Sequence, residues 1–284
     1  MSEIIDSFGG KDFFVTIVEE QDLLGLSSGY EGGDFRNQGL ADLMFSALPD
    51  FALTFSELGT ITSRNMIERL RRAVKTIYQS GKFKNRGEFG ELLLHLVMRD
   101  YFGSVPAISK IYYKDSANST VKGFDAVHVV PQGNDLSLWL GETKFYNNMS
   151  GAISSVVDEI KDHIKPEYLK NEFLLVSGKI EPSWPYAEKL KKLLDPKTSL
   201  DEVFNRLVVP VLLTYDSSSV QAHTEDSQKY RDELKEELIK HHGSFKGRDL
   251  PKEIEIVLIM VPLHTKETLA ETLHNKLVHL QQGL

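Results

Sequence analysis

Two acids and a lysine lie close together in residues 123–146, whose sequence is GFDAVHVVPQGNDLSLWLGETKFY. Asp125 stands near the start of one apolar run, and Glu142 and Lys144 stand at the end of the next. A pair of carboxylates is the usual way for a protein to hold Mg²⁺ for phosphate chemistry, and an ammonium group can offset the charge of the phosphate. These residue types therefore indicate metal-dependent chemistry on a phosphate ester.

The spacing of the two runs predicts a β-hairpin. Gly133-Asn134 is a favoured two-residue turn, and with this turn at the centre Asp125 lies directly opposite Glu142. Strand alternation then places Lys144 on the same face as both acids. Facing carboxylates ~5 Å apart are destabilising unless a positive charge lies between them, so the hairpin predicts a bound cation. A register shifted by one residue would send the acids to opposite faces.

The acid-x-lysine triplet is weak evidence by itself. Only Glu142-Thr143-Lys144 ends an apolar strand and has a carboxylate at the facing position. The alternative interpretation is an exposed strand end with a surface ion pair. The other three triplets stand in helical or loop contexts: Glu159-Ile160-Lys161, Asp195-Pro196-Lys197 and Glu233-Leu234-Lys235.

A predicted helix at 88–101 precedes the hairpin and supplies a third acid. Its sequence is apolar nearly all round, which indicates a buried helix. Glu88 would lie in the first turn of this helix, where its negative charge interacts favourably with the positive end of the helix dipole. Glu91 leads into the leucine run, so its carboxylate should be carried inward, where it needs a cation or hydrogen bonds. His95, His128 and His163 are interpreted as core or surface histidines, because zinc-type spacing is absent.

Composition limits the possible partners and the location. The 284-residue chain has no cysteine, so any metal must be held by oxygen or histidine. It has neither a long apolar run nor a signal-peptide pattern, and we expect a cytoplasmic protein without a membrane partner.

Positive charge is concentrated in residues 62–86, although the net charge of the chain is −8. The segment has eight basic residues and one acid, which suits local contact with nucleic-acid phosphate. A solvated helix face is the alternative. The predicted nucleic-acid contacts are Arg64, Arg71, Arg72, Lys75, Lys82, Lys84 and Arg86.

Hydrophobic periodicity predicts an α/β fold with a central mixed sheet flanked by helices, and an N-terminal mixed α/β extension. We expect residues 1–84 to form the N-terminal segment with its basic helix, and residues 85–284 to form the core. The predicted strands are 13–18, 108–113, 124–130, 136–145, 173–176, 207–215 and 254–261, and the predicted helices include 63–78, 88–101, 150–164, 186–194, 228–241 and 269–280.

The order of these motifs resembles the core of PD-(D/E)XK nucleases: Glu91 on a helix, Asp125 on a strand, and Glu142-Thr143-Lys144 on the next strand. The GxxxE form of residues 87–91, together with GFDA and GETKFY, is more narrowly similar to HamA, the nuclease-like subunit family of the Hachiman antiphage defence system. Asp125 follows phenylalanine and not proline, a departure that the superfamily tolerates.

The resemblance implies roles for these residues. Asp125, Glu142 and the main-chain carbonyl of Thr143 would bind Mg²⁺, for which Mn²⁺ could substitute, and Glu91 would assist through water or a second metal. Lys144 would orient the attacking water or offset phosphate charge.

Two functions stay open from the sequence. The first is a Mg²⁺-dependent deoxyribonuclease that acts in defence with a HamB-like helicase partner and needs no organic cofactor. The second is a catalytically inactive, nuclease-like DNA-binding or regulatory subunit of a helicase complex, in which the acids are structural.

Overall fold

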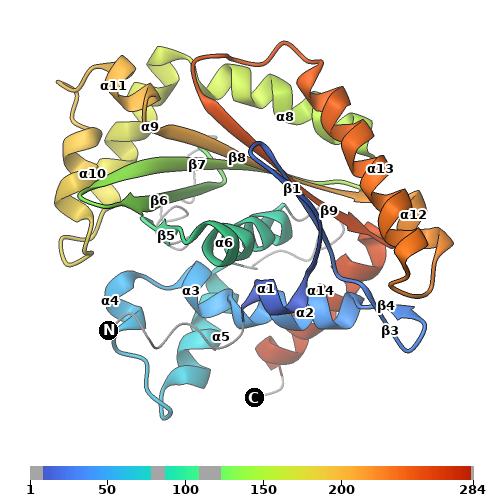
Figure 1. The fold of residues 1–284 in the computed structure, drawn as a ribbon. Coiled ribbons are helices and arrows are strands. Elements are labelled where there is room, and N and C mark those ends of the chain that lie inside the picture. Colours follow the sequence, from blue (N-terminus) through green and yellow to red (C-terminus); the bar gives the residue numbers. More distant parts are fainter. Residues whose placement is uncertain (1–8, 78–86, 109–122, 283–284) are drawn as a thin grey trace.

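A seven-stranded mixed sheet forms the centre of the protein (Figure 1). The computed structural model describes residues 9–77, 87–108 and 123–282. The order of the strands is β1-β2-β9-β8-β7-β6-β5, and β3 and β4 form a separate small ribbon. The strands are β1 Val15–Glu20, β2 Leu23–Ser27, β3 Tyr30–Glu31, β4 Asp34–Phe35, β5 Val105–Pro106, β6 Ala126–Gln132, β7 Asp135–Phe145, β8 Leu207–Asp216 and β9 Glu255–Leu263.

Parallel pairing in the middle of the sheet explains the most apolar segments. Strand β8 pairs in parallel with β7 and with β9, and β2 also pairs in parallel with β9. Parallel strands are covered on both faces, so their sequences are continuously apolar rather than alternating. Strands β7 and β8 are accordingly buried along nearly their whole length. The expected mixed sheet is thus confirmed.

Helices cover both faces of this sheet (Figure 1). Side chains of successive strand residues enter two separate apolar clusters, one on each side. On one side lie α1 Gly10–Phe13, α2 Asn37–Ser46, α3 Leu48–Ala52, α4 Phe55–Leu58, α5 Met66–Ile77, α6 Glu88–Phe102 and α14 Lys266–Gln282. On the other lie α8 Met149–His163, α9 Pro166–Lys179, α10 Ala187–Leu193, α11 Leu200–Phe204, α12 Ser218–Ala222 and α13 Gln228–Lys246.

The hairpin of β6 and β7 has the predicted register. Ala126 pairs with Gly141 and Gln132 with Asp135, which leaves Gly133-Asn134 as the turn. Gly133 has φ +59°, a left-handed conformation that glycine adopts without steric cost. The alternation places the side chains of residues 127, 129, 138 and 140 in the cluster on the α8 side.

The structure departs from the prediction at residues 173–176, which belong to helix α9 and not to a strand. Leu169, Phe173 and Val176 are buried at helical spacing, whereas Leu174 and Leu175 are exposed. The predicted strand 108–113 falls almost entirely outside the described residues. Strands β1 and β2 come from the expected N-terminal segment and pair into the same sheet as the core strands.

A buried polar chain fastens α6 to β6 and α3. His95 Nε2 lies 2.8 Å from Asp50 Oδ2, and His95 Nδ1 lies 3.2 Å from His128 Nε2. His128 Nδ1 lies 2.8 Å from Ser104 Oγ, and Arg99 also binds Asp50. Burial lowers the pKa of His95 to about 3 and that of His128 well below its ordinary value, so both rings are neutral. Every ring nitrogen in this series then has a hydrogen-bond partner, because each neutral ring donates one hydrogen bond and accepts another.

Candidate functional site

A polar cleft of about 500 Å³ opens where β7 ends. Asp125, Thr143 and Lys144 line it together with Gly87, which precedes α6, and Lys266, the first residue of α14. Three of the predicted site residues therefore lie in one cleft. The residues that line the cleft come from segments far apart in the sequence, since Lys266 lies more than a hundred residues after Lys144.

The backbone around the hairpin holds Asp125 in place. Its N–H donates to the carbonyl of Gly141 at 2.9 Å, just beyond the last ladder pair of β6 and β7. Its carboxylate Oδ2 accepts the N–H of Thr143 at 2.9 Å. The side chain is thus fixed across the end of β7 and beside the residues of the Glu-Thr-Lys triplet.

Glu142 is the most deeply buried acid of the group, with only 1% of its surface exposed. Its Oε1 forms a hydrogen bond with His163 Nδ1 on α8. Burial raises the pKa of Glu142 well above its usual range, and the nearby charge of Glu159 raises it further, while Lys144 acts in the opposite direction. The site therefore contains more negative charge than its own cation balances.

Lys144 supplies that cation and is itself largely buried. Its ammonium group forms an ion pair and hydrogen bond with Glu159 on α8. Burial alone would lower the pKa of Lys144, but Glu159, Asp125 and Glu142 raise it above its ordinary value. The side chain is therefore a firmly charged ammonium held among three carboxylates.

Helices α8 and α9 contribute side chains that the sequence analysis did not assign to the site. The ring of His163 stacks on Tyr168 with centroids 4.4 Å apart, and Glu172 is buried nearby and raises the pKa of Glu142. Burial lowers the pKa of His163, which favours a neutral ring in hydrogen-bond contact with Glu142 through Nδ1. The available signal was the spacing of four residues, which joins Glu159 to His163 and Tyr168 to Glu172 on one helix face each.

Glu91 approaches from α6, the helix that packs on the other side of β7. A Cβ atom at Gly90 would lie only 2.8 Å from Thr143 Oγ1, which shows how closely α6 meets the strand. Glu91 is half-buried, with its Oε2 fully buried, and its charge adds to the raised pKa of Glu142. Glu91 does not line the cleft itself.

The described part of the basic segment lies away from the cleft lining. Arg64 precedes α5 and is exposed, and Arg71 is half-exposed on that helix. Arg69 and Arg72 each lie 3.4 Å from the carboxylate of Glu57, so part of this positive charge is neutralised within the protein. Lys82, Lys84 and Arg86, and the side chain of Lys75, fall outside the described residues.

The donor set at the cleft fits an oxygen-preferring divalent cation. Asp125 directly precedes β6, and Glu142 lies buried on β7 behind the residues that line the cleft. Glu159, Glu172 and Glu91 add negative charge around Glu142. A divalent ion would favour the ionised form of Glu142, which the surrounding acids and burial disfavour. Magnesium binds oxygen ligands, commonly one or two carboxylates with water and substrate phosphate, which is the set available here.

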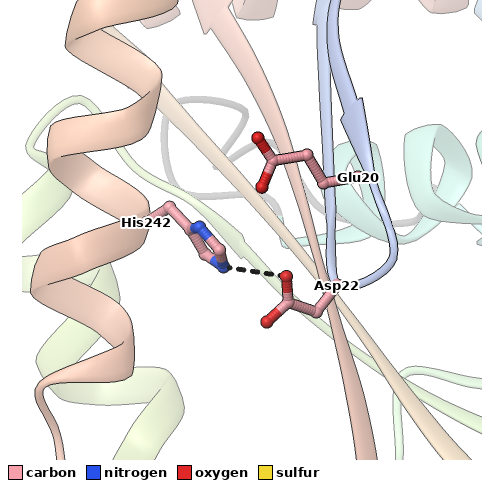
Figure 2. A group of neighbouring side chains, drawn as sticks. All are labelled: Glu20, Asp22 and His242. Carbon is pink, nitrogen blue, oxygen red and sulfur yellow. Dashed lines mark ion pairs between the residues drawn. The ribbon is translucent and has the colours of Figure 1, made fainter.

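A second group of acids and a histidine lies at the turn between β1 and β2, beside α13 (Figure 2). Within the described ranges, Glu20, Asp22 and His242 bring their donor atoms within 4.8 Å of one another. Asp22 also binds Lys246 at 2.7 Å, and His242 Nε2 lies 3.4 Å from Asp22. Two cationic or hydrogen-bonding partners on α13 already satisfy this acid, so we interpret the group as an ion-pair network that fastens the β1–β2 turn to α13.

The fold and cleft define the class of the protein: a mixed α/β sheet covered by helices on both faces, with an acid- and lysine-lined site at a strand end. Residues 3–277 match the sequence pattern of the HamA family, so the chain belongs to that family. Membership implies a role in Hachiman defence and a system with partner subunits. No curated protein sequence matches the chain. In the described ranges, no helix combines the length and apolar character needed to cross a bilayer.

Proposed function

We propose that this protein is a Mg²⁺-dependent deoxyribonuclease with a PD-(D/E)XK-type site at the end of β7. The observation that supports this most is the joint placement of Asp125, Thr143 and Lys144 in one polar cleft. Glu142 does not line the cleft, but its buried carboxylate is close enough to Lys144 for each to shift the pKa of the other. HamA membership supports the same assignment, because the family belongs to a defence system.

Each residue then has a distinct task. Asp125, Glu142 and the main-chain carbonyl of Thr143 would hold Mg²⁺, and Glu91 would assist from α6. When bound, the metal supplies Lewis-acid activation of the phosphate and a lower pKa for bound water. Lys144 orients the attacking water or stabilises the charge that develops on the scissile phosphate. The ammonium group has three N–H donors, so it can contact the phosphate or the water while one N–H stays with Glu159.

The internal ion pairs also support a second function. Glu142 is hydrogen-bonded to His163, and Lys144 is paired with Glu159, so the protein satisfies both groups without metal or substrate. Such pairing is what a catalytically inactive, nuclease-like DNA-binding or regulatory subunit would retain for stability. The two functions differ in whether the acids and the lysine are needed for hydrolysis.

A cleavage assay separates the two functions. Purified protein, alone and with a HamB-like helicase partner, is incubated with DNA in Mg²⁺, in Mn²⁺ and in EDTA. Glu142→Gln and Lys144→Ala should each lower the cleavage rate by about a hundredfold or more, the usual cost of removing one group that stabilises the transition state. Both variants should keep the wild-type circular dichroism spectrum.

Matched substitutions at exposed positions control for the loss of charge. Glu271→Gln on α14 and Lys240→Ala on α13 remove the same groups from positions outside the cleft. These variants should cleave DNA at the wild-type rate. Cleavage by Glu142→Gln or Lys144→Ala at the control rate would refute the hydrolytic site and favour the regulatory function.

A further inference from the structure

A second lysine faces the proposed hydrolytic residues from the far end of the chain. Lys266 is the first residue of α14 and lines the same cleft as Asp125 and Lys144. Helix α14 packs on the α6 side of the sheet, so the two lysines reach the cleft from different elements. Lys266 lies outside every motif that the sequence offers.

The backbone and one aromatic ring fix the position of Lys266. Its N–H donates to Asp216 Oδ1 at 2.6 Å, which ties the start of α14 to the end of β8. Its ammonium nitrogen lies 5.4 Å from the ring centroid of Phe145, in a cation–π contact. Thr265 accepts the N–H of Thr268 at 3.3 Å and so caps the first turn. Lys266 is therefore held in the cleft rather than free to sample the solvent.

The two lysines of the cleft differ in their partners. Lys144 is paired with Glu159, whereas no carboxylate among residues 9–77, 87–108 and 123–282 lies within ion-pair distance of the Lys266 ammonium group. The ring of Phe145 attracts this cation but does not neutralise it. A half-buried cation of this kind is stabilised by an anion, and the anion that the neighbouring site would bring is a phosphate.

We infer that Lys266 is a phosphate-contact residue that binds the DNA backbone in the cleft and positions the strand against Asp125 and Lys144. This inference rests on the proposed function, and it assigns the α14 side of the cleft to the substrate strand. The metal-binding side is then formed by Asp125 and the end of β7, and the DNA strand passes between that side and α14. Lysine suits this task because it binds phosphate as a point charge without base readout.

The test compares three variants with the wild-type protein: Lys266→Ala, Lys266→Arg and the control Lys240→Ala. Binding to a fluorescent DNA duplex is measured by anisotropy in EDTA across a salt series, and cleavage is measured in Mg²⁺. Lys266→Ala should weaken binding about tenfold, the effect of losing one charge-assisted contact, and should reduce the slope of log K against log salt by about 0.7 to 0.9. Lys266→Arg should retain most of the affinity, and Lys240→Ala all of it.

The cleavage data distinguish this inference from the proposed function. A contact residue should raise KM while kcat changes little, because the reacting groups are untouched. If Lys266→Ala and Lys240→Ala bind DNA equally and with the same salt slope, the inference is wrong, whether or not the wild-type protein cleaves. If Lys266→Ala weakens binding but the wild-type protein never cleaves DNA, the contact is supported and hydrolysis is refuted. A wild-type protein that binds no DNA would overturn both.

Discussion

Replacing Glu142 by glutamine should stabilise the fold while it removes the proposed activity. Burial and the neighbouring acids raise the pKa of this carboxyl well above its ordinary value of about 4.5. The folded protein therefore holds the proton more tightly than the unfolded chain does. Above pH 4.5 the free energy of unfolding falls as the pH rises toward the folded pKa, because the unfolded state binds fewer protons in that window. Glutamine has no proton to lose, so this pH-dependent loss of stability disappears, and its amide can still form a hydrogen bond with His163.

The size of the effect follows from linkage. One titrating group changes the free energy of unfolding by at most about 1.4 kcal/mol per pH unit. Between pH 5 and pH 7 the stability advantage of Glu142→Gln over wild type should therefore grow by as much as about 2.7 kcal/mol. Other titrating groups occur in both proteins and cancel in the difference, apart from those that interact directly with Glu142.

Urea unfolding followed by circular dichroism measures this difference at several pH values, in EDTA and at constant ionic strength. The control Glu271→Gln removes an exposed acid and should show a difference from wild type that does not change with pH. Adding Mg²⁺ should then stabilise wild type but not Glu142→Gln, because a ligand stabilises only the state that binds it. A pH-independent difference between Glu142→Gln and wild type would refute the assignment of Glu142 as an electrostatically strained acid.

Three further predictions concern other parts of the molecule. Because burial lowers the pKa of His95 to about 3, stability should fall by about 2 kcal/mol for this group as the pH drops from 6.5 to 5, and urea unfolding of His95→Gln should show a smaller loss. Gly90→Ala should cost about 1 to 3 kcal/mol through its clash with β7, whereas Gly243→Ala, with open space around it, should stabilise α13 by up to about 1 kcal/mol; thermal melts test both. The double variant Arg71→Ala/Arg72→Ala should weaken DNA binding and flatten its salt dependence, and an unchanged slope would indicate that these side chains are only a solvated helix face.

The hairpin could be predicted in detail because its determinants are local. A Gly-Asn turn and strand alternation fix the register, and the register places Asp125 beside the Glu-Thr-Lys triplet. The central strands β8 and β9 were equally visible as apolar runs bounded by polar segments. These features depend on residues that are close together in the sequence.

Helix α9 shows where local reasoning failed. The sequence Phe-Leu-Leu-Val at 173–176 has the composition of a short buried strand, but its two central leucines are exposed on a helix. Periodicity over the whole segment 166–179, which begins with proline, would have favoured a helix. A four-residue apolar run is too short to distinguish the two structures.

The remaining site residues could not be predicted because tertiary packing brings them there. Glu159 belongs to a Glu-x-Lys triplet that looks like an ordinary helix surface, yet α8 turns it toward Lys144. His163 and Glu172 reach Glu142 only when α8 and α9 cover β7. Lys266 arrives from a helix near the other end of the sequence. The spacing of four residues places Glu159 and His163 on one helix face, but it does not say which strand that face will contact.

The position of β9 in the sheet determines when the nascent chain can complete its fold. Strand β9 lies between β2 and β8, so the first hairpin has no edge to join until residues 255–263 have left the ribosome. The contact of Asp22 with Lys246 alone joins positions 224 residues apart, and such distant pairings form slowly. Nascent chains stalled before Glu255 should leave β1 and β2 open to protease. The seven-stranded sheet can therefore form only after residues 255–263 have been synthesised.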